Sequence, residues 1–233
     1  MPTQNCQRSN AGELHLIVDS TGLKLRGAGE WLFEKHGTIE CRAWRKLHIG
    51  IDANNGEIVA FDLTGKDVDD ASHVEPLLDQ LAHAPASLMG DGAYDRSTVY
   101  DVIASRNPHA TFIVAPCKGS APGPRATSSP TQRDQRILTI VAHGRMNWQK
   151  TSGYNRRSLA EAAISRYKRV IGDTLKSRAD DRRMTEVAIA VKSLNRMREL
   201  GQAKYIRRRP NCAPQSLRAT LPRGIAAIRS QRG

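Results

Sequence analysis

Two aspartates follow apolar runs, at positions where an α/β sheet often carries functional side chains. Asp19 follows the apolar run Leu16–Val18, and Asp91 follows Leu88–Met89. Both carboxylates are therefore predicted at the carboxyl ends of buried strands, the edge where sheets of this kind collect ligands. Aspartate also caps turns such as those that follow each strand here. For either residue taken alone, turn capping is as good an explanation as chemistry.

A third carboxylate belongs to a patterned segment with basic and aromatic neighbours. If one helix carries Tyr154, Arg157, Glu161 and Lys168, its rotation of about 100° per residue places all four within an arc of about 60°. Apolar residues lie mostly on the opposite side of this helix and predict a core-facing stripe made of Leu159, Ala163, Tyr167 and Val170. An alternative remains open, because Ser158–Glu161 also matches a capping box in which Glu161 reaches back to the Ser158 amide.

The elements that must position these side chains form a mixed pattern. Strands are predicted over residues 13–19, 46–52, 57–63, 86–91 and 110–115. Helices are predicted over residues 70–81, 97–106, 136–142, 155–171 and 183–200. Three antiparallel strands followed by alternating helices and strands predict an α/β fold, a mixed sheet with flanking helices and a helical C-terminal part. This layout is compatible with a ribonuclease-H-like sheet.

Charge is distributed unevenly along the 233 residues. The chain has 36 Lys and Arg against 23 Asp and Glu, a formal net charge of +13. Residues 1–144 carry a net charge of −3, whereas residues 145–233 carry +16. A basic terminal third on a near-neutral body predicts a surface that faces a polyanion, of which nucleic acid is the commonest. We expect a short polar leader over 1–12, one catalytic domain over 13–201 and a basic, mobile tail over 202–233.

Cysteine usage and hydropathy exclude several classes of protein. The four cysteines stand alone without a C-x-x-C pair, so neither a zinc cluster nor a disulfide framework is indicated, and oxygen ligands would have to hold any metal. No apolar run approaches the roughly 20 residues that span a membrane, and the first ten residues lack the hydrophobic stretch of a signal peptide. We expect a cytoplasmic protein without a membrane partner.

Together these residues resemble the DDE transposases of bacterial insertion sequences, in the group named for insertion sequence five. The similarity runs from about Glu13 to Leu200. The spacing of Tyr154, Arg157, Glu161 and Lys168 matches the signature of that group without a gap. The other matching segments are Asp19–Gly22, Gly29–Trp31, His36–Gly37, Trp44–His48, Gly90–Asp95 and Ser152–Glu161.

The resemblance implies a ribonuclease-H-like core in which Asp19, Asp91 and Glu161 form an acidic triad that holds Mg²⁺, for which Mn²⁺ may stand in. Hard Mg²⁺ prefers carboxylates, water and phosphate oxygens, and two such ions serve phosphodiester transfer. The implied reactions are DNA cleavage at transposon ends and strand transfer into target DNA. Arg157 and Lys168 would hold phosphates, and Tyr154 would lie near the cleaved end. The implied partner is double-stranded DNA, and the implied location is the nucleoid. Whether the protein forms a homodimer stays an open question.

The resemblance weakens ahead of the first predicted strand. Relatives carry a sizeable amino-terminal region thought to bind the inverted repeats, whereas only residues 1–12 precede the strand here. We therefore expect either a truncated transposase or one whose missing part is encoded separately. Two other functions stay open: a ribonuclease-H-like nuclease without strand transfer, and an inactive DNA-binding remnant. Among further motif residues we expect Trp31 and Trp44 to pack, His48 to be a packed or surface histidine and not a ligand, and Asp52 and Asp95 to be turn or helix-start residues outside the triad.

Overall fold

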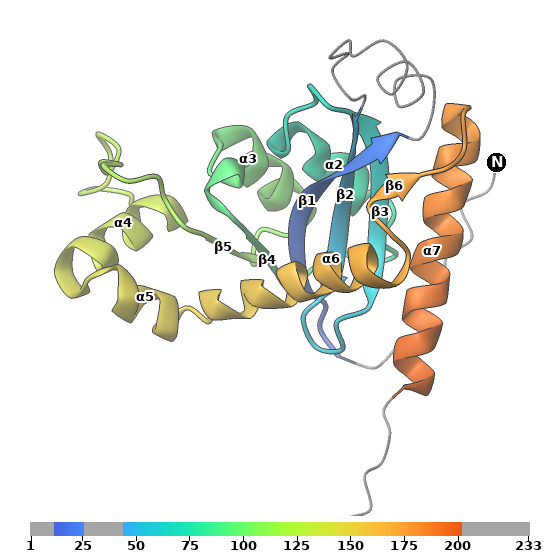
Figure 1. Ribbon diagram of the computed structural model, residues 1–233. Helices are drawn as coiled ribbons and strands as arrows, with labels where there is room; N and C mark the ends of the chain where they lie inside the picture. The colour runs from blue at the N-terminus through green and yellow to red at the C-terminus, as the bar shows by residue number, and fades with distance from the viewer. Residues whose placement is uncertain (1–11, 26–43, 202–233) are drawn as a thin grey trace, which may run out of the picture. The chain divides into compact units, whose positions relative to one another are not determined.

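The computed structural model describes residues 12–25 and 44–201. The predicted leader, apart from its last residue, and the predicted tail lie outside the described residues, as do Trp31 and the rest of the motif at 29–37. The described part is built on a six-stranded sheet (Figure 1). None of its helices is long and apolar enough to cross a membrane.

The sheet combines an antiparallel half with a parallel half. Its main path runs β3-β2-β1-β4-β5, and β6 pairs separately with β1. β1 and β2, and likewise β2 and β3, are antiparallel, whereas β4 and β6 run parallel to β1 and β5 runs parallel to β4. The strands are β1 His15–Leu25, β2 Trp44–Asp52, β3 Ile58–Gly65, β4 Ser87–Gly90, β5 Thr111–Val114 and β6 Thr174–Leu175. This mixed sheet with flanking helices confirms the predicted ribonuclease-H-like α/β fold.

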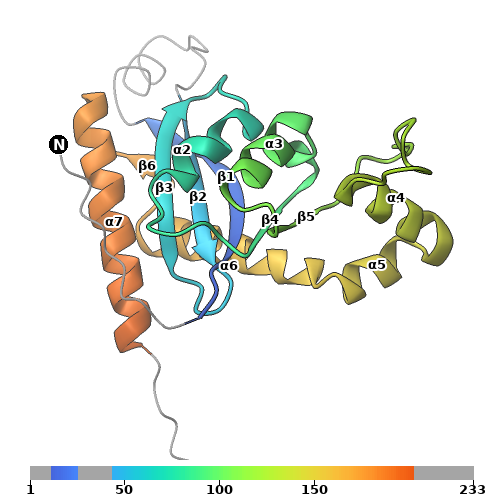
Figure 2. The ribbon, with the colours of Figure 1, turned by 180° about the vertical axis from the view of Figure 1, so that it is seen from behind.

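Helices cover both faces of the sheet. In Figure 1, α6 crosses the near face; Figure 2 shows α2 and α3 on the opposite face. The helices before residue 144 are η1 Ala71–His73, α2 Val74–Leu78, η2 Gly92–Tyr94, α3 Ser97–Arg106 and α4 Gln132–His143. Those after it are α5 Arg145–Thr151, η3 Tyr154–Arg157, α6 Ser158–Val170 and α7 Asp180–Leu200.

The two faces of β1 bury separate cores because side chains alternate along a strand. Leu16 and Val18 join the core beneath η1, α2 and α3. Ile17 and Leu23 join the core that α6 and α7 cover. Asp19 lies two positions after Ile17 and four before Leu23, so its side chain points to the same face of the sheet as theirs, the face that α6 covers.

Two predicted boundaries at the first strand and first helix are wrong. β1 does not end at Asp19 but continues to Leu25, because Ser20–Leu23 pair with β2 and hydrogen bonding across the sheet outweighs their turn-like composition. The helix predicted over 70–81 is a short 3₁₀ turn followed by α2, which ends at Leu78.

The helix predicted over 155–171 also differs in detail. It starts as the 3₁₀ turn η3 and becomes α-helical at Ser158. The predicted apolar stripe is partly wrong, because Leu159 is 38% and Val170 is 45% exposed. The buried residues of α6 are Ala160, Ala163 and Tyr167. Small alanines let α6 approach the sheet closely, and this brings the neighbouring Glu161 toward β1.

Candidate active site

The site lies at a notch beside β1. β4 pairs with β1 only over His15–Ile17, and β6 pairs with it only over Lys24–Leu25. Between these pairings Val18–Leu23 is flanked by β2 on one side and has no strand on the other, within the described residues. Asp19 stands in this interval. The departure of β4 therefore opens the edge of β1 at the position of the first carboxylate.

The register of the parallel pair places the second carboxylate beside the first. Ile17 lies opposite Met89, and Asp19 and Asp91 each lie two residues after this last pair, close enough for the charge of Asp91 to raise the Asp19 pKa. Asp91 follows the last residue of β4 and caps η2, where its Oδ1 accepts from the Ala93 amide at 2.8 Å. Asp19 Oδ1 accepts from the Ser20 amide at 2.8 Å. Turn capping thus holds Asp91 in place without excluding it from chemistry.

The glycine before Asp91 admits a buried tyrosine. A Cβ at Gly90 would fall 2.7 Å from Cδ2 of Tyr94, whose ring is 1% exposed. Burial raises the pKa of Tyr94 well above 10.0, and the charges of Asp70, Asp19 and Asp91 raise it further. The tyrosine therefore stays protonated beneath the turn that carries Asp91.

The third carboxylate comes from α6 and pairs with an arginine. Arg157, the last residue of η3, donates from Nη2 to Glu161 Oε1, and its Nη1 lies 3.7 Å from Asp19 Oδ2. The capping-box alternative is wrong. The Glu161 side chain forms an ion pair with Arg157, and no side chain caps the start of α6. One guanidinium thereby links a strand carboxylate to a helix carboxylate.

Electrostatics show that the carboxylates share one neighbourhood. Burial is the largest cause that raises the pKa of Asp19 above its usual value of 3.8. The Ser20 amide and Arg157 lower it, whereas the charges of Asp91 and Glu161 raise it. The charges of Asp91 and Glu161 thus both reach Asp19, although the three residues come from separate segments of the chain.

The sequence matches the model of a known protein family over most of its length. The model described as "Transposase DDE domain" matches residues 10–196. The chain belongs to this family. As a transposase domain it acts on DNA, and its relatives generally use divalent metal ions for phosphodiester chemistry.

The donor set of this transposase domain fits a divalent cation in its chemistry, since carboxylate oxygens are the ligands that Mg²⁺ prefers. As the side chains stand, however, no group of three or more His, Cys, Asp or Glu in the described ranges is arranged to hold a metal ion. Arg157 pairs with Glu161 and lies 3.7 Å from Asp19, so one side-chain cation already lies beside two of the three carboxylates.

Of the two other residues predicted to contact DNA, Tyr154 lies near the carboxylates and Lys168 lies further along α6. Burial raises the pKa of Tyr154, and the charges of Asp91 and Glu161 add to this rise, so its hydroxyl lies near both carboxylates. Its ring lies 5.2 Å from that of Trp148. Lys168 lies seven residues beyond Glu161, roughly 10 Å along α6. It makes no hydrogen bond or ion pair with the other predicted site residues among those described.

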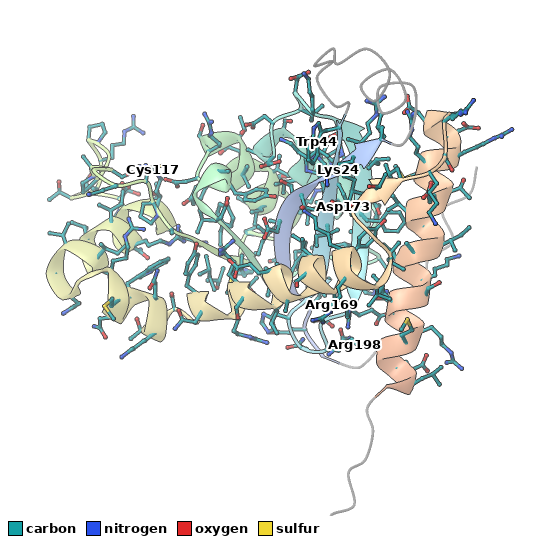
Figure 3. The ribbon with its side chains drawn as sticks, viewed as in Figure 1. Lys24, Trp44, Cys117, Arg169, Asp173 and Arg198 are labelled. Carbon is teal, nitrogen blue, oxygen red and sulfur yellow. The ribbon has the colours of Figure 1, made fainter. Side chains whose placement is uncertain are left out.

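Lys24 and Asp173 close the far end of the notch. Lys24 Nζ lies 2.6 Å from Asp173 Oδ2 and ties the end of β1 to the chain just before β6. Figure 3 labels this pair with Trp44, whose ring lies 6.0 Å from Lys24 Nζ. Trp44 packs over Gly22, where a Cβ would fall 3.0 Å from the ring, and is 37% exposed. The expected packing of Trp44 is met only in part, because the ring covers Gly22 on the sheet surface but lies outside the core.

The remaining predicted bystanders have structural partners. Asp95 pairs with Arg133 at 3.0 Å and accepts from the Tyr100 hydroxyl at 3.1 Å. Asp52 accepts from the Asn54 amide in the β2–β3 hairpin. His48 is fully buried, with Nε2 2.8 Å from Thr64 Oγ1. These contacts confirm the turn role of Asp52 and the packing of His48, whereas Asp95 forms a partly buried ion pair that the sequence did not predict.

Sequence reasoning missed a polar cluster behind the site. The rings of His48 and His73 stack with centroids 4.5 Å apart, and His73 Nε2 lies 2.5 Å from Asp62 Oδ2. Asp70 lies 3.7 Å from His48 Nδ1 and 3.2 Å from Lys46 Nζ. The alternation of polar side chains along β2 was the available signal. Their partners on η1 and β3 are distant in sequence.

Proposed function

We propose that the chain cleaves DNA at the ends of a transposable element and joins the freed ends to target DNA. One observation carries the proposal: the charges of Asp91 and Glu161, both far from Asp19 in sequence, raise the pKa of Asp19 at an open edge of a ribonuclease-H-like sheet. Carboxylates concentrated in this way oppose one another unless a cation joins them. A site for metal-assisted phosphodiester chemistry explains why such a costly arrangement is present.

Asp19, Asp91 and Glu161 would hold Mg²⁺, with Mn²⁺ as its substitute. When bound, the ion neutralises charge that develops on the phosphate and activates the attacking hydroxyl. The protein's own part is orientation. The Ala93 and Ser20 amides fix the two aspartates, and the close packing of α6 on β1 sets the distance to Glu161.

Positive charge on the same face supports DNA as the substrate. Arg157 and Lys168 are proposed to bind phosphates, and Tyr154 to lie against the cleaved end. The net charge of +16 over residues 145–233 supports a broader contact with the DNA backbone. We place the reaction on chromosomal DNA in the cytoplasm, and a homodimer would allow both ends to be held together.

The test uses purified protein, Mg²⁺ or Mn²⁺, and labelled duplexes made from the DNA that flanks its coding sequence. We expect nicks at one defined position on each side, followed by joining to a target plasmid. Asp91→Ala and Glu161→Ala should abolish both products while DNA affinity stays within about three-fold of wild type. Nicking without joining would instead establish a nuclease. DNA binding without either product, in both metals, would establish a non-catalytic DNA-binding protein.

A further inference from the structure

Arg157 occupies a special place among the basic residues of the site. Its two terminal nitrogens face different carboxylates, Asp19 on β1 at 3.7 Å and Glu161 one helical turn onward. The Arg157 side chain is 24% exposed, that of Asp19 16% and that of Glu161 56%. The guanidinium is therefore partly withdrawn from water and is held by two of the three groups proposed to bind metal.

This pairing competes with metal binding. Glu161 Oε1 accepts from the guanidinium and is not free to donate to a cation, and the positive charge 3.7 Å from Asp19 Oδ2 also repels an incoming ion. Metal binding must therefore displace Arg157 from the carboxylates. The displaced guanidinium is fully charged, presents several donors and needs a new anionic partner, for which a DNA phosphate is well suited.

We infer that Arg157 is an exchangeable counterion that couples metal binding to DNA binding. Without metal it offsets part of the negative charge of Asp19 and Glu161 and is withheld from DNA. With metal it is released to a phosphate of the bound duplex. The inference rests on the proposed function, because it takes the triad as the metal site. A fixed structural ion pair would behave differently, since its loss would weaken the fold and the metal site together.

The first experiment measures metal binding without DNA or catalysis. Wild type and Arg157→Gln are titrated with Ca²⁺ by calorimetry at constant ionic strength. We expect Arg157→Gln to bind Ca²⁺ about ten-fold more tightly, because the competing charge is gone. Arg169→Gln is the matched control: Arg169 is an exposed arginine on the last turn of α6 (Figure 3) and should leave Ca²⁺ affinity within about two-fold. Unchanged or weaker binding in Arg157→Gln overturns the inference.

The second experiment measures the coupling itself. The affinity for a fluorescent duplex oligonucleotide is determined with and without Ca²⁺. In wild type we expect Ca²⁺ to tighten DNA binding about ten-fold, within the usual range of coupling between two sites. In Arg157→Gln this gain should fall below about two-fold, while Arg169→Gln keeps it. A full gain in Arg157→Gln would show that the ion acts on DNA without Arg157.

Two further variants keep the result interpretable. Asp91→Asn removes a proposed metal ligand and leaves Arg157 and its partners in place. Equal Ca²⁺ binding by wild type and Asp91→Asn overturns the triad, whereas weaker binding there without the gain in Arg157→Gln overturns the exchange alone. Arg157→Lys keeps the charge and should restore the low Ca²⁺ affinity of wild type. If Arg157→Gln does not fold, as circular dichroism would show, the wild-type and Arg157→Lys titrations decide: equal Ca²⁺ affinities support a charge-based role, and unequal ones contradict it.

Discussion

The ring of Tyr94 lies in the space that a side chain at Gly90 would need, with Tyr94 Cδ2 2.7 Å from the position of a Cβ. The contact joins the last residue of β4 to the buried end of η2. Asp91 stands between the two. The geometry of this carboxylate therefore depends on a glycine that makes no chemical contribution of its own.

Gly90→Ala should consequently damage both stability and cleavage. The added methyl group must move the ring or the strand, an overpacking that costs about 1–3 kcal/mol. Urea denaturation measures the loss, and the cleavage assay should show a larger fractional loss than the folded population explains. Gly65→Ala is the control, since nothing lies within 4 Å of a Cβ there. Equal behaviour of the two variants would refute the role of the Tyr94 contact.

The sequence predicts most elements of this domain but not the notch. Local apolar runs predict the strands that carry Asp19 and Asp91, but the pairing of these two strands in the sheet is known only from the structure. β6 has only two residues and leaves no periodic signal. Its position is decided by pairing with Lys24 and Leu25, about 150 residues away in the chain.

The surroundings of Glu161 could be predicted from the sequence only in part. Helical spacing correctly groups it with Tyr154 and Arg157, and the structure shows Arg157 in contact with Glu161. Spacing cannot reveal that the same guanidinium also reaches Asp19, because that contact depends on how closely α6 packs on β1. A pattern along one helix carries no information on what lies across from it.

Asp19→Asn should separate stability from activity. Burial raises the Asp19 pKa and the charges of Asp91 and Glu161 raise it further, so the ionised carboxylate opposes folding at neutral pH. The neutral amide removes that cost, and we expect Tm in EDTA to rise by about 2–5 °C. Cleavage should fall about 1,000-fold or more. Asp101→Asn, on the exposed side of α3, should change neither quantity. A lower Tm in Asp19→Asn would contradict this reasoning.

The Asp95–Arg133 pair should matter for stability and not for chemistry. The Asp95 side chain is 1% exposed and that of Arg133 is 34% exposed. Arg133→Gln leaves a buried carboxylate without its cation and should cost about 1–3 kcal/mol, measured by urea denaturation. Adding Asp95→Asn should recover part of the loss, because the stranded charge is then gone. Full additivity of the two substitutions would show that the pair does not act as a unit.

His48 should make the protein sensitive to mild acid. Burial lowers its pKa from 6.5 to about 4, and His73 and Lys46 lower it while Asp70 and Asp62 oppose them. The folded protein thus binds this proton more weakly than the unfolded chain does. The resulting stability is complete above pH 6.5 and is lost as the pH falls toward about 4, by up to about 3 kcal/mol.

Urea denaturation between pH 7.5 and 4.5 measures the contribution of His48. Other groups also titrate over this range, so the difference between wild type and His48→Gln isolates the histidine. We expect the stability advantage of wild type to shrink steadily below pH 6.5, because only wild type must bury a group that the unfolded chain protonates. His83→Gln, at an exposed position, should follow wild type throughout. A constant difference between wild type and His48→Gln across the whole range would mean that His48 does not resist protonation.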